Sequence, residues 1–513
     1  MNSSENQNNF NMNNPNCFDW IEKWALYTPN NLVFKDHNSN RSWTYYEFNL
    51  RTTALANYLK KEFKLKKKDR LLFYSINRPE HVFFFFACIK IGVIFVPLNF
   101  RLTPNEIDYL VTDSDPSLFV YDITFEEKVN KLKSLKPKAQ ISLLSKFSEF
   151  AFGKIKKISF ELEETISADD VVLILYTSGT TGIPKGAMIN HRMLFWNSIN
   201  TELRLNINSN DHTQNFAPFF HTGAWNVLLT PFIHHGASLT LLSNFDPDLI
   251  LRLIEEEKTT IFFGVPTMLQ MMSQSPLFEK ADISSIRYAV VGGAPMPIPL
   301  INKWHKKGVA IRQGYGLTEV GPNCFSLHQD DAIRKIGSIG FPNFYINAKI
   351  VDENGIECEK NEVGELCLKS PVVTPGYWNK PGETAKTIKD GWFYTGDMLR
   401  KDEEGYFYVV DRKKNMFISG GENIYPSEIE KIILSNEYIE DCTVIGVPDE
   451  KWDEVGKAFV VIKKNCNISK EQIIKICSDK LAKYKIPKYI QFIEFLPRNE
   501  AGKIEREKLK NLI

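Results

Sequence analysis

The chain has 513 residues, more than the roughly 250 to 300 at which a single hydrophobic core stops growing, so at least two domains are expected. Its 63 basic and 62 acidic side chains almost cancel, which argues against a nucleic-acid partner bound through bulk positive charge. The eight cysteines form no CxxC or CxxH pattern, so the sequence predicts neither a zinc site nor a disulfide framework. A reducing, cytoplasmic location is therefore expected.

The amino terminus is rich in asparagine and lacks both a basic start and an apolar centre, so residues 1–17 are predicted to be a disordered tail and not a secretory signal. The most apolar stretch, residues 82–96, contains four consecutive phenylalanines but is interrupted by Lys90 and Gly92. It is too short for a transmembrane helix and is predicted to be a buried helix followed by a buried strand. Peripheral contact with a membrane is the alternative.

Through about residue 345, strand-like apolar runs alternate with amphipathic helical runs. Such alternation predicts parallel sheets covered by helices, the α/β class. The predicted strands cover residues 71–75, 93–97, 171–176, 238–242, 260–264 and 288–292.

A loop rich in hydroxyls and glycines, YTSGTTGIPKG at residues 176–186, follows the predicted strand 171–176. Backbone N–H groups and hydroxyls in such a turn bind phosphate, and Lys185 adds a positive charge. Pro184 stands where the pattern GxxxxGK[ST] has its second glycine, so a P-loop NTPase is excluded. The sequence predicts a phosphate-binding loop of another kind, with a flexible linker as the alternative.

From residue 348 the pattern changes to short strands joined by turns, at 348–351, 365–370 and 406–412. After the polar stretch 411–415, two helices at 427–435 and 470–484 with several strands predict a separate α+β domain. The predicted domains are the tail, an N-terminal domain at 18–411 with a β-rich subdomain at about 345–411, a hinge at 412–415 and a C-terminal domain at 416–513.

Further segments combine glycines with polar groups suited to binding or catalysis. Each also has a purely structural interpretation, as a strand-end turn, a turn-forming aspartate, a packed histidine or a surface turn. They are APFFHTG at 217–223, GGAP at 292–295, QGYGLTE at 313–319, YTGD at 394–397, VDRKK at 410–414, ISGGENIYP at 418–426 and LPRNEAGKI at 496–504.

In this order along the chain, these segments resemble the adenylate-forming superfamily, in its branch of acyl-CoA synthetases, over about residues 18–510. The resemblance implies an ATP-dependent acid–thiol ligase with a large N-terminal domain and a small, mobile C-terminal domain. It also implies Mg²⁺ as the cofactor, with ATP and coenzyme A as co-substrates.

The resemblance assigns a role to individual residues of this chain. Lys503, Thr318, Glu319 and Lys185 become catalytic residues, and Glu319 also binds Mg²⁺. Lys414 becomes the hinge, and the Gly420–Gly421 loop takes part in thioester formation. Phe220, His221 and Gly223 line the acyl pocket. The ATP- and AMP-binding set is Thr177, Ser178, Gly179, Thr180, Thr181, Gly182, Gly293, Ala294, Pro295, Gly314, Tyr315, Gly316, Asp397 and Arg412.

The chemistry is consistent with these roles. A carboxylic acid with a pKa near ~4 is ionised at neutral pH, so its attack on the α-phosphorus of ATP requires charge neutralisation and no general base. A thiol then displaces AMP, which leaves far more readily than the oxygen of a free carboxylate. Between these steps the C-terminal domain is expected to rotate about Lys414, withdrawing Lys503.

The substrate is predicted to be a medium- or long-chain fatty acid. Residues 219–225 contain no aspartate to bind an amino-acid ammonium group, and Gly316-Leu317 stands where acetate-specific relatives place a tryptophan. An aryl or arylpropenoic acid is the alternative substrate. Transfer to a carrier protein and a non-catalytic acyl-adenylate binder are the remaining alternatives.

Overall fold

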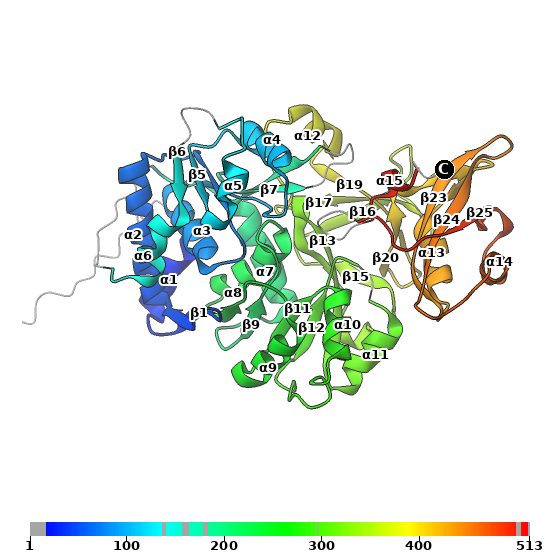
Figure 1. The fold of residues 1–513 in the computed structure, drawn as a ribbon, viewed down its shortest axis with the longest axis horizontal. Helices are drawn as coiled ribbons and strands as arrows, with labels where there is room; N and C mark the ends of the chain where they lie inside the picture. Colours follow the sequence, from blue (N-terminus) through cyan, green and yellow to red (C-terminus); the bar gives the residue numbers. More distant parts are fainter. Residues whose placement is uncertain are drawn as a thin grey trace, which may run out of the picture. The chain divides into compact units, whose positions relative to one another are not determined.

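The computed structural model describes residues 17–135, 140–155, 164–177, 183–294, 296–498 and 504–510 (Figure 1). The predictions for residues 1–16, for Ser178, Gly179, Thr180, Thr181 and Gly182, and for Pro295 and Lys503 lie outside these ranges. The described residues form two compact units. The first unit comprises the described parts of Met1–Asn347 and Lys369–Gly391, and the second those of Ala348–Leu368 and Trp392–Ile513.

A six-stranded sheet of the first unit carries the predicted phosphate-binding segment. Its order is β6 (Gln140–Leu143), β5 (Leu118–Tyr121), β3 (Arg70–Tyr74), β4 (Ile94–Pro97), β7 (Val171–Thr177) and β8 (Lys185–Asn190). All neighbours pair in parallel except β7 and β8, which form an antiparallel hairpin. The predicted parallel sheet is confirmed, but Lys185 begins a strand that the sequence did not predict.

Two further sheets complete the first unit. One has the order β2 (Arg41–Thr44), β1 (Leu32–Asp36), β10 (Ser238–Leu241) and β9 (His212–Asn215). The other includes β11 (Ile261–Gly264), β12 (Tyr288–Val291), β13 (Ala310–Leu317), β14 (Gly321–Ser326) and β15 (Ser338–Pro342). Strands β11, β12 and β13 are parallel, whereas β13, β14 and β15 are antiparallel, so the predicted strands 260–264 and 288–292 are confirmed.

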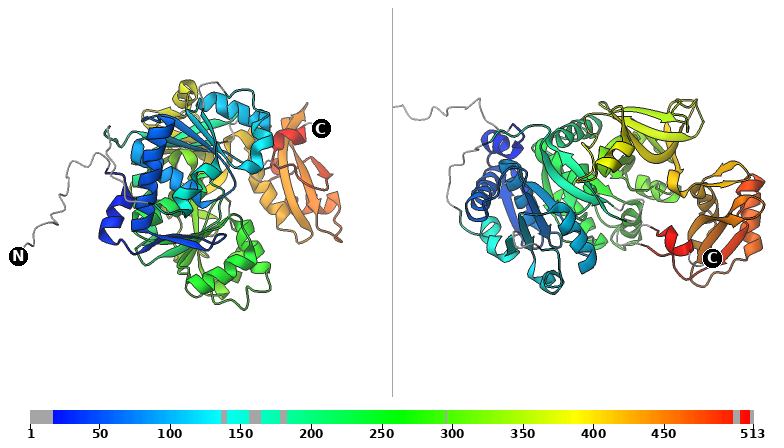
Figure 2. Two further views of the ribbon diagram at one scale, coloured as in Figure 1. Left: turned by 60° about the vertical axis from the view of Figure 1, so that its left-hand side comes forward. Right: turned by 90° about the horizontal axis from the view of Figure 1, so that it is seen from above.

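Helices surround these sheets, and those near the amino terminus are the blue helices in both views of Figure 2. The helices of the first unit are α1 (Trp20–Tyr27), α2 (Tyr45–Phe63), α3 (Pro79–Ile91), α4 (Pro104–Ser114), α5 (Glu126–Val129), α6 (Ser148–Phe152), α7 (His191–Leu205), α8 (Leu229–His234), α9 (Pro247–Glu257), α10 (Pro266–Gln274), α11 (Ile298–Lys306) and α12 (Pro381–Thr387).

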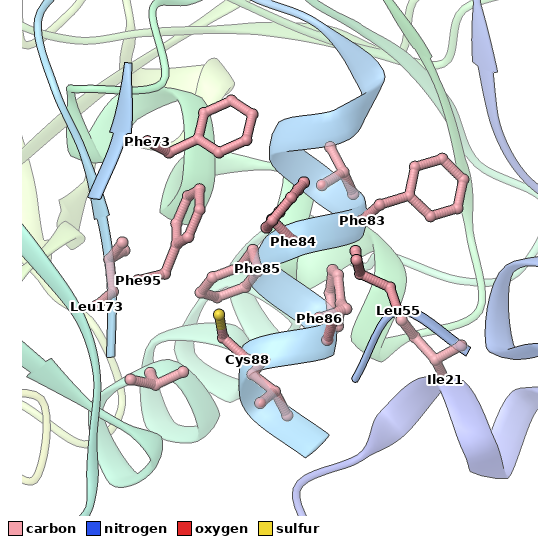
Figure 3. Packing of buried hydrophobic residues seen from close by; sticks show 14 of the residues in the cluster. Ile21, Leu55, Phe73, Phe83, Phe84, Phe85, Phe86, Cys88, Phe95 and Leu173 are labelled. Carbon is pink, nitrogen blue, oxygen red and sulfur yellow. The ribbon is translucent and has the colours of Figure 1, made fainter. Parts of the chain in front are cut away.

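Helix α3 holds the four consecutive phenylalanines, and all of its residues are buried (Figure 3). Phe84 packs on Phe73 of β3, and Phe85 packs on Phe95 of β4. Pro79 starts the helix, and Gly92 ends it with a left-handed φ of 68°. The predicted buried helix and following strand are confirmed. Because none of the four rings is more than 1% exposed, this stretch offers no aromatic surface for the alternative of peripheral membrane contact.

The second unit contains the β-rich strands and the α+β fold predicted for the end of the chain. Strands β16 (Asn347–Val351), β17 (Gly364–Lys369), β19 (Trp392–Lys401) and β20 (Phe407–Arg412) are neighbours in one sheet. A second sheet has the order β22 (Glu422–Ile424), β21 (Phe417–Ser419), β24 (Asp453–Ile462) and β23 (Ile439–Asp449), and β25 (Tyr489–Phe492) pairs with β24.

Among its described residues, the second unit has the α-helices α13 (Pro426–Leu434), α14 (Lys470–Ser478) and α15 (Arg506–Lys510). Helix α13 matches the prediction. Helix α14 ends six residues before the predicted end at Tyr484. After Asp479, the N–H groups of Lys480 and Leu481 both donate to the carbonyl of Cys477, so the regular i→i−4 pattern stops there. The sequence prediction of this helix end was wrong.

Candidate active site

The β7–β8 hairpin fixes the two ends of the predicted phosphate-binding loop. Tyr176 donates from its hydroxyl to Asp113, with an O–O distance of 2.8 Å, and Thr177 pairs with Lys185 across the hairpin. On the other arm, the carbonyl oxygen of Pro184 accepts a hydrogen bond from Tyr109 at 3.1 Å. The described ends of the loop are therefore held by side chains from α4.

Lys185 is already paired with a carboxylate. Its ammonium nitrogen lies 2.5 Å from Glu383 on α12, and only 12% of the lysine side chain is exposed. Glu383 also accepts from Lys386 at 2.7 Å. The hydrogen bonds from Lys185 and then Lys386 lower the pKa of Glu383 to about 2, so this carboxylate is ionised at neutral pH. The predicted phosphate-binding lysine thus has a fixed anionic neighbour before any nucleotide is bound.

Glu319 is held by the hydroxyl of Tyr377. It lies in the short helix Thr318–Val320, between β13 and β14, and its Oε1 accepts from Tyr377 at 3.0 Å. Burial and then the charge of Glu319 raise the pKa of the Tyr377 hydroxyl, which therefore stays protonated as a donor. The ring of Tyr377 also lies 5.4 Å from the ammonium nitrogen of Lys185. Tyr377 accordingly contacts two of the four residues that were assigned catalytic roles, Glu319 and Lys185.

The segment that carries Tyr377 was not singled out from the sequence. It pairs with β8 through an N–H of Trp378 that donates to Gly186 and a hydroxyl of Thr374 that donates to Met188. The N–H of Thr374 also donates to the carbonyl of Glu319 at 2.7 Å. The only sequence signal is the run PGYWNKP at 375–381, in which an aromatic pair lies between turn residues.

Several predicted ATP- and AMP-binding residues gather near the carboxyl ends of β12 and β13. The side-chain amide of Gln313 donates to the carbonyl oxygens of Val291 and Ala294, at 3.1 Å each, and so ties the loop at Gly293 to the next strand. In open α/β sheets, ligands bind at this edge. The structure therefore brings Gly293, Ala294 and Gly314 together.

Tyr315 and Gly316 follow on β13. The Tyr315 ring lies edge-on to Phe325, with 5.7 Å between centroids. A Cβ atom on Gly316 would lie 2.3 Å from the carbonyl oxygen of Gly321, so only glycine fits between these antiparallel strands without a backbone shift. The glycine pattern of QGYGLTE thus has a packing cause as well as the binding role implied by resemblance.

The predicted acyl-pocket residues lie in a segment held by a buried asparagine. Phe220 is buried with its ring 5.6 Å from Phe100 and 4.5 Å from His221, which is exposed, and Gly223 begins a π-helical turn. Asn77 donates to the carbonyl of Ala217 at 2.8 Å and accepts from the N–H of Phe219 at 3.2 Å. Asn77 was missed from the sequence because it lies 142 residues from Phe219.

In the second unit, Asp397 and Arg412 face each other across β19 and β20. Arg412 donates from Nε to Asp397 at 2.6 Å, and the aspartate is 2% exposed. The paired guanidinium offsets part of the cost of burying this carboxylate. The structure therefore brings these two predicted ATP- and AMP-binding residues together as an ion pair.

The predicted hinge and thiolation loop also lie in the second unit. Lys414 is in a short 3₁₀ turn, and burial, then the charges of Arg412 and Arg506, lower its pKa. Gly420 and Gly421 form the two-residue turn between β21 and β22, with φ of 58° and 86°. Positive φ at both positions is the requirement of a type I′ hairpin turn, so the turn itself accounts for both glycines.

The chemistry of the described side chains fits Mg²⁺. Hard oxygen ligands suit this ion, which usually takes one or two carboxylates together with substrate phosphates. Glu319 offers a carboxylate and Thr318 a hydroxyl, whereas no group of three or more His, Cys, Asp or Glu side chains suited to a metal occurs among the described residues. Within the same residues, no helix has the length and apolarity needed to cross a membrane.

This chain is similar to known proteins over nearly its whole length. Three curated relatives are similar over nearly their whole length. Feruloyl-CoA synthase from Amycolatopsis sp is 36% identical over 494 residues, covering 96% of this chain and 98% of that protein. Indoleacetate–CoA ligase from Aromatoleum aromaticum is 33% identical, with 96% and 98% covered. Long-chain-fatty-acid–CoA ligase FadD13 from Mycobacterium tuberculosis is 33% identical, with 96% and 97% covered.

Solved structures agree. ATP-bound MatB from Rhodopseudomonas palustris superposes with a TM-score of 0.88 at 30% identity, covering 97% of this chain and 98% of that one. MenE from Bacillus subtilis in complex with ATP and a magnesium ion gives 0.86 at 29% identity, with 96% and 99% covered. The AMP-binding enzyme family matches residues 21–378, and the AMP-binding enzyme C-terminal domain matches residues 428–503. The chain therefore belongs to the AMP-binding enzyme family of the adenylate-forming superfamily, in its acyl-CoA ligase branch.

Proposed function

We propose that this protein, an AMP-forming acid–CoA ligase, activates an aryl or arylpropenoic acid with Mg-ATP and transfers the acyl group to coenzyme A. The observation that carries the reaction type is the arrangement of Lys185, Tyr377 and Glu319. The ammonium group of Lys185 and the carboxylate of Glu319 both contact the side chain of Tyr377, beside the predicted phosphate-binding loop.

In the first half-reaction, the substrate carboxylate attacks the α-phosphorus of ATP. A new bond forms between a carboxylate oxygen and the α-phosphorus, while the bond between the α-phosphorus and the oxygen that bridges it to the β-phosphorus breaks. Pyrophosphate leaves with the electron pair of the broken bond. Two anions must approach, so neutralising and positioning the phosphates is the main catalytic requirement. Lys185 supplies positive charge for the β- and γ-phosphates, Thr318 donates a hydroxyl to the α-phosphate, and Lys503 bridges carboxylate and phosphate. Mg²⁺, held by Glu319, would neutralise phosphate charge.

In the second half-reaction, the thiol sulfur attacks the acyl carbon and AMP leaves. We assign Asp397 and Arg412 to the ribose and Gly420–Gly421 to the thiolation step. The domain boundaries proposed for these steps are 18–411, a hinge at 412–415 and 416–513. For a coenzyme A thiol with a pKa of about 8.5, the site must favour the thiolate, since the thiolate is the nucleophile.

The substrate class rests on the relatives. The sequence favoured a medium- or long-chain fatty acid, which we place second. FadD13, named as a long-chain-fatty-acid–CoA ligase, supports this candidate. Feruloyl-CoA synthase and indoleacetate–CoA ligase, named for aromatic acids, match over the same extent. We therefore place the aryl acid first.

A pyrophosphate-release assay tests both the reaction and the substrate. Ferulate, indoleacetate, succinylbenzoate, decanoate and palmitate are compared with coenzyme A, with acyl carrier protein and with neither acceptor. We expect an aryl acid to give the highest kcat/KM and coenzyme A to give the thioester. A fatty acid as the best substrate would reverse the order of candidates, thioester on the carrier protein alone would replace coenzyme A as acceptor, and no release with any acid would favour a non-catalytic binder.

Lys414→Pro tests the proposed hinge. Proline restricts φ at position 414 and the conformation of Lys413, so rotation there is expected to become harder. We expect thioester formation to slow about tenfold more than adenylate formation, since stiff hinges impair the conformational step. Both half-reactions are measured separately. Lys414→Ala, which removes the same side chain without stiffening the backbone, is the control, and equal slowing of both halves by proline would contradict hinge motion.

A further inference from the structure

Tyr377 contacts both Lys185 and Glu319, but the reaction described above gives it no role. We propose that Tyr377 is a positioning residue that orients the Glu319 carboxylate for the magnesium ion of Mg-ATP. This inference rests on the proposed function, since it takes Glu319 as the magnesium ligand.

The contact between Tyr377 and Glu319 is specific. The hydroxyl donates to one oxygen, Oε1, at 3.0 Å, so one of the two carboxylate oxygens is engaged by the protein. A glutamate side chain loses conformational freedom when it becomes a metal ligand, and holding it beforehand removes part of that cost. Tyr377 is 8% exposed, and a hydrogen bond to an ionised group is stronger where water is excluded.

Two backbone contacts hold Tyr377 itself. Its N–H donates to the hydroxyl of Thr384 at 2.9 Å, and its backbone bridges to Ala187 of β8. Gly376 before it has a φ of 135°, and a Cβ there would lie 2.5 Å from Thr384. The close packing of this backbone therefore fixes the position from which the Tyr377 side chain extends. A side chain that served only to fill space would need neither the hydroxyl nor its alignment with Glu319.

The second contact, which is made by the ring, favours an aromatic side chain at this position. The ring centroid lies 5.4 Å from the ammonium nitrogen of Lys185, within the range of a cation–π interaction. Tyr377→Phe keeps this contact and removes only the hydroxyl. The substitution therefore separates the effect on Glu319 from the effect on Lys185.

The test measures ATP binding by titration calorimetry with and without Mg²⁺, using the full-length protein and no acid substrate. For Tyr377→Phe, we expect ATP affinity without Mg²⁺ to be unchanged and the Mg²⁺ concentration that gives half-maximal ATP binding to rise about tenfold. Tyr377→His, which keeps a ring and an N–H donor, should recover part of this loss. In a Glu319→Gln background, Tyr377→Phe should add little, because the two changes act on one interaction.

The matched control is Tyr45→Phe, which removes another buried hydroxyl, one that donates to the carbonyl of Ala237 at 2.8 Å. It should lower the unfolding temperature without changing the Mg²⁺ dependence. Equal loss of ATP affinity with and without Mg²⁺ in Tyr377→Phe, no change at all, or full additivity with Glu319→Gln would overturn the proposal. A wild-type protein whose ATP binding ignores Mg²⁺ would instead refute the proposed function, so the two failures are distinguishable.

Discussion

Replacing Lys503 with alanine is expected to lower the rate of acyl-adenylate formation by about 10² to 10³, the usual effect of losing one preorganised electrostatic group. The rate of thioester formation from preformed acyl-adenylate should remain near that of the wild type. The reason is that two anions meet only in the first half-reaction, where we propose that the ammonium group of Lys503 bridges carboxylate and α-phosphate. Acid-dependent exchange of pyrophosphate into ATP measures the first half, and thioester formation from synthetic acyl-adenylate measures the second.

Lys510→Ala is the matched control for this experiment. Lys510 is also near the end of the chain, and its ammonium pairs with Glu507 at 3.0 Å on an exposed helix face. Such exposed pairs contribute about 0 to 1 kcal/mol, so both half-reactions should be unaffected. Similar losses of rate in both half-reactions for a folded Lys503→Ala protein would show that the lysine does not act in adenylate formation alone.

Glu319→Gln is expected to reduce adenylate formation by about 10², because it removes the negative charge for Mg²⁺ at a preorganised electrostatic site. The amide oxygen of glutamine can still accept from Tyr377, so local packing should be preserved. Higher Mg²⁺ should restore part of the rate, whereas thioester formation from preformed acyl-adenylate should need no Mg²⁺ and remain unchanged. Rates are measured over a Mg²⁺ titration at saturating ATP.

The control for Glu319→Gln is Glu256→Gln, which removes an exposed carboxylate from α9. It should leave the Mg²⁺ dependence at the wild-type value. A Glu319→Gln protein with the same Mg²⁺ dependence as the control would exclude Glu319 as the ligand, even if its overall rate were low.

The regular elements were largely predictable because their signals are local. The apolar runs at 71–75, 171–176 and 288–292 correspond to β3, β7 and β12 within one or two residues, and the proline and glycine that bound α3 were visible in the chain. The end of α14 was not predictable. Leu481 continues the apolar spacing of the helix and packs against the core, but it does so from a turn and not from a helix.

The site residues were identified by resemblance, whereas the contacts that hold them were not predictable. Tyr377 and Glu319 are 58 residues apart, and Lys185 and Glu383 are 198 apart. Neither pair has a periodic or spacing signal, since each depends on how the segment around Thr374 lies against β8. Asn77 was missed for the same reason. The strand that begins at Lys185 was missed because it directly follows Pro184, which has no N–H to donate to a strand.

The turn at Gly420–Gly421 bears on which thiol, free coenzyme A or a tethered pantetheine, accepts the acyl group. Both positions require a left-handed backbone, and the ring of Trp452 lies so close to Gly420 that a Cβ there would be only 2.7 Å away. In the thiolation step that we propose for this loop, the two positions can therefore offer an arriving thiol only peptide N–H and carbonyl groups, and these groups are the same for every acceptor. Selectivity between free coenzyme A and a tethered pantetheine has to be encoded in neighbouring side chains, so these two glycines can stay fixed while acceptor preference varies.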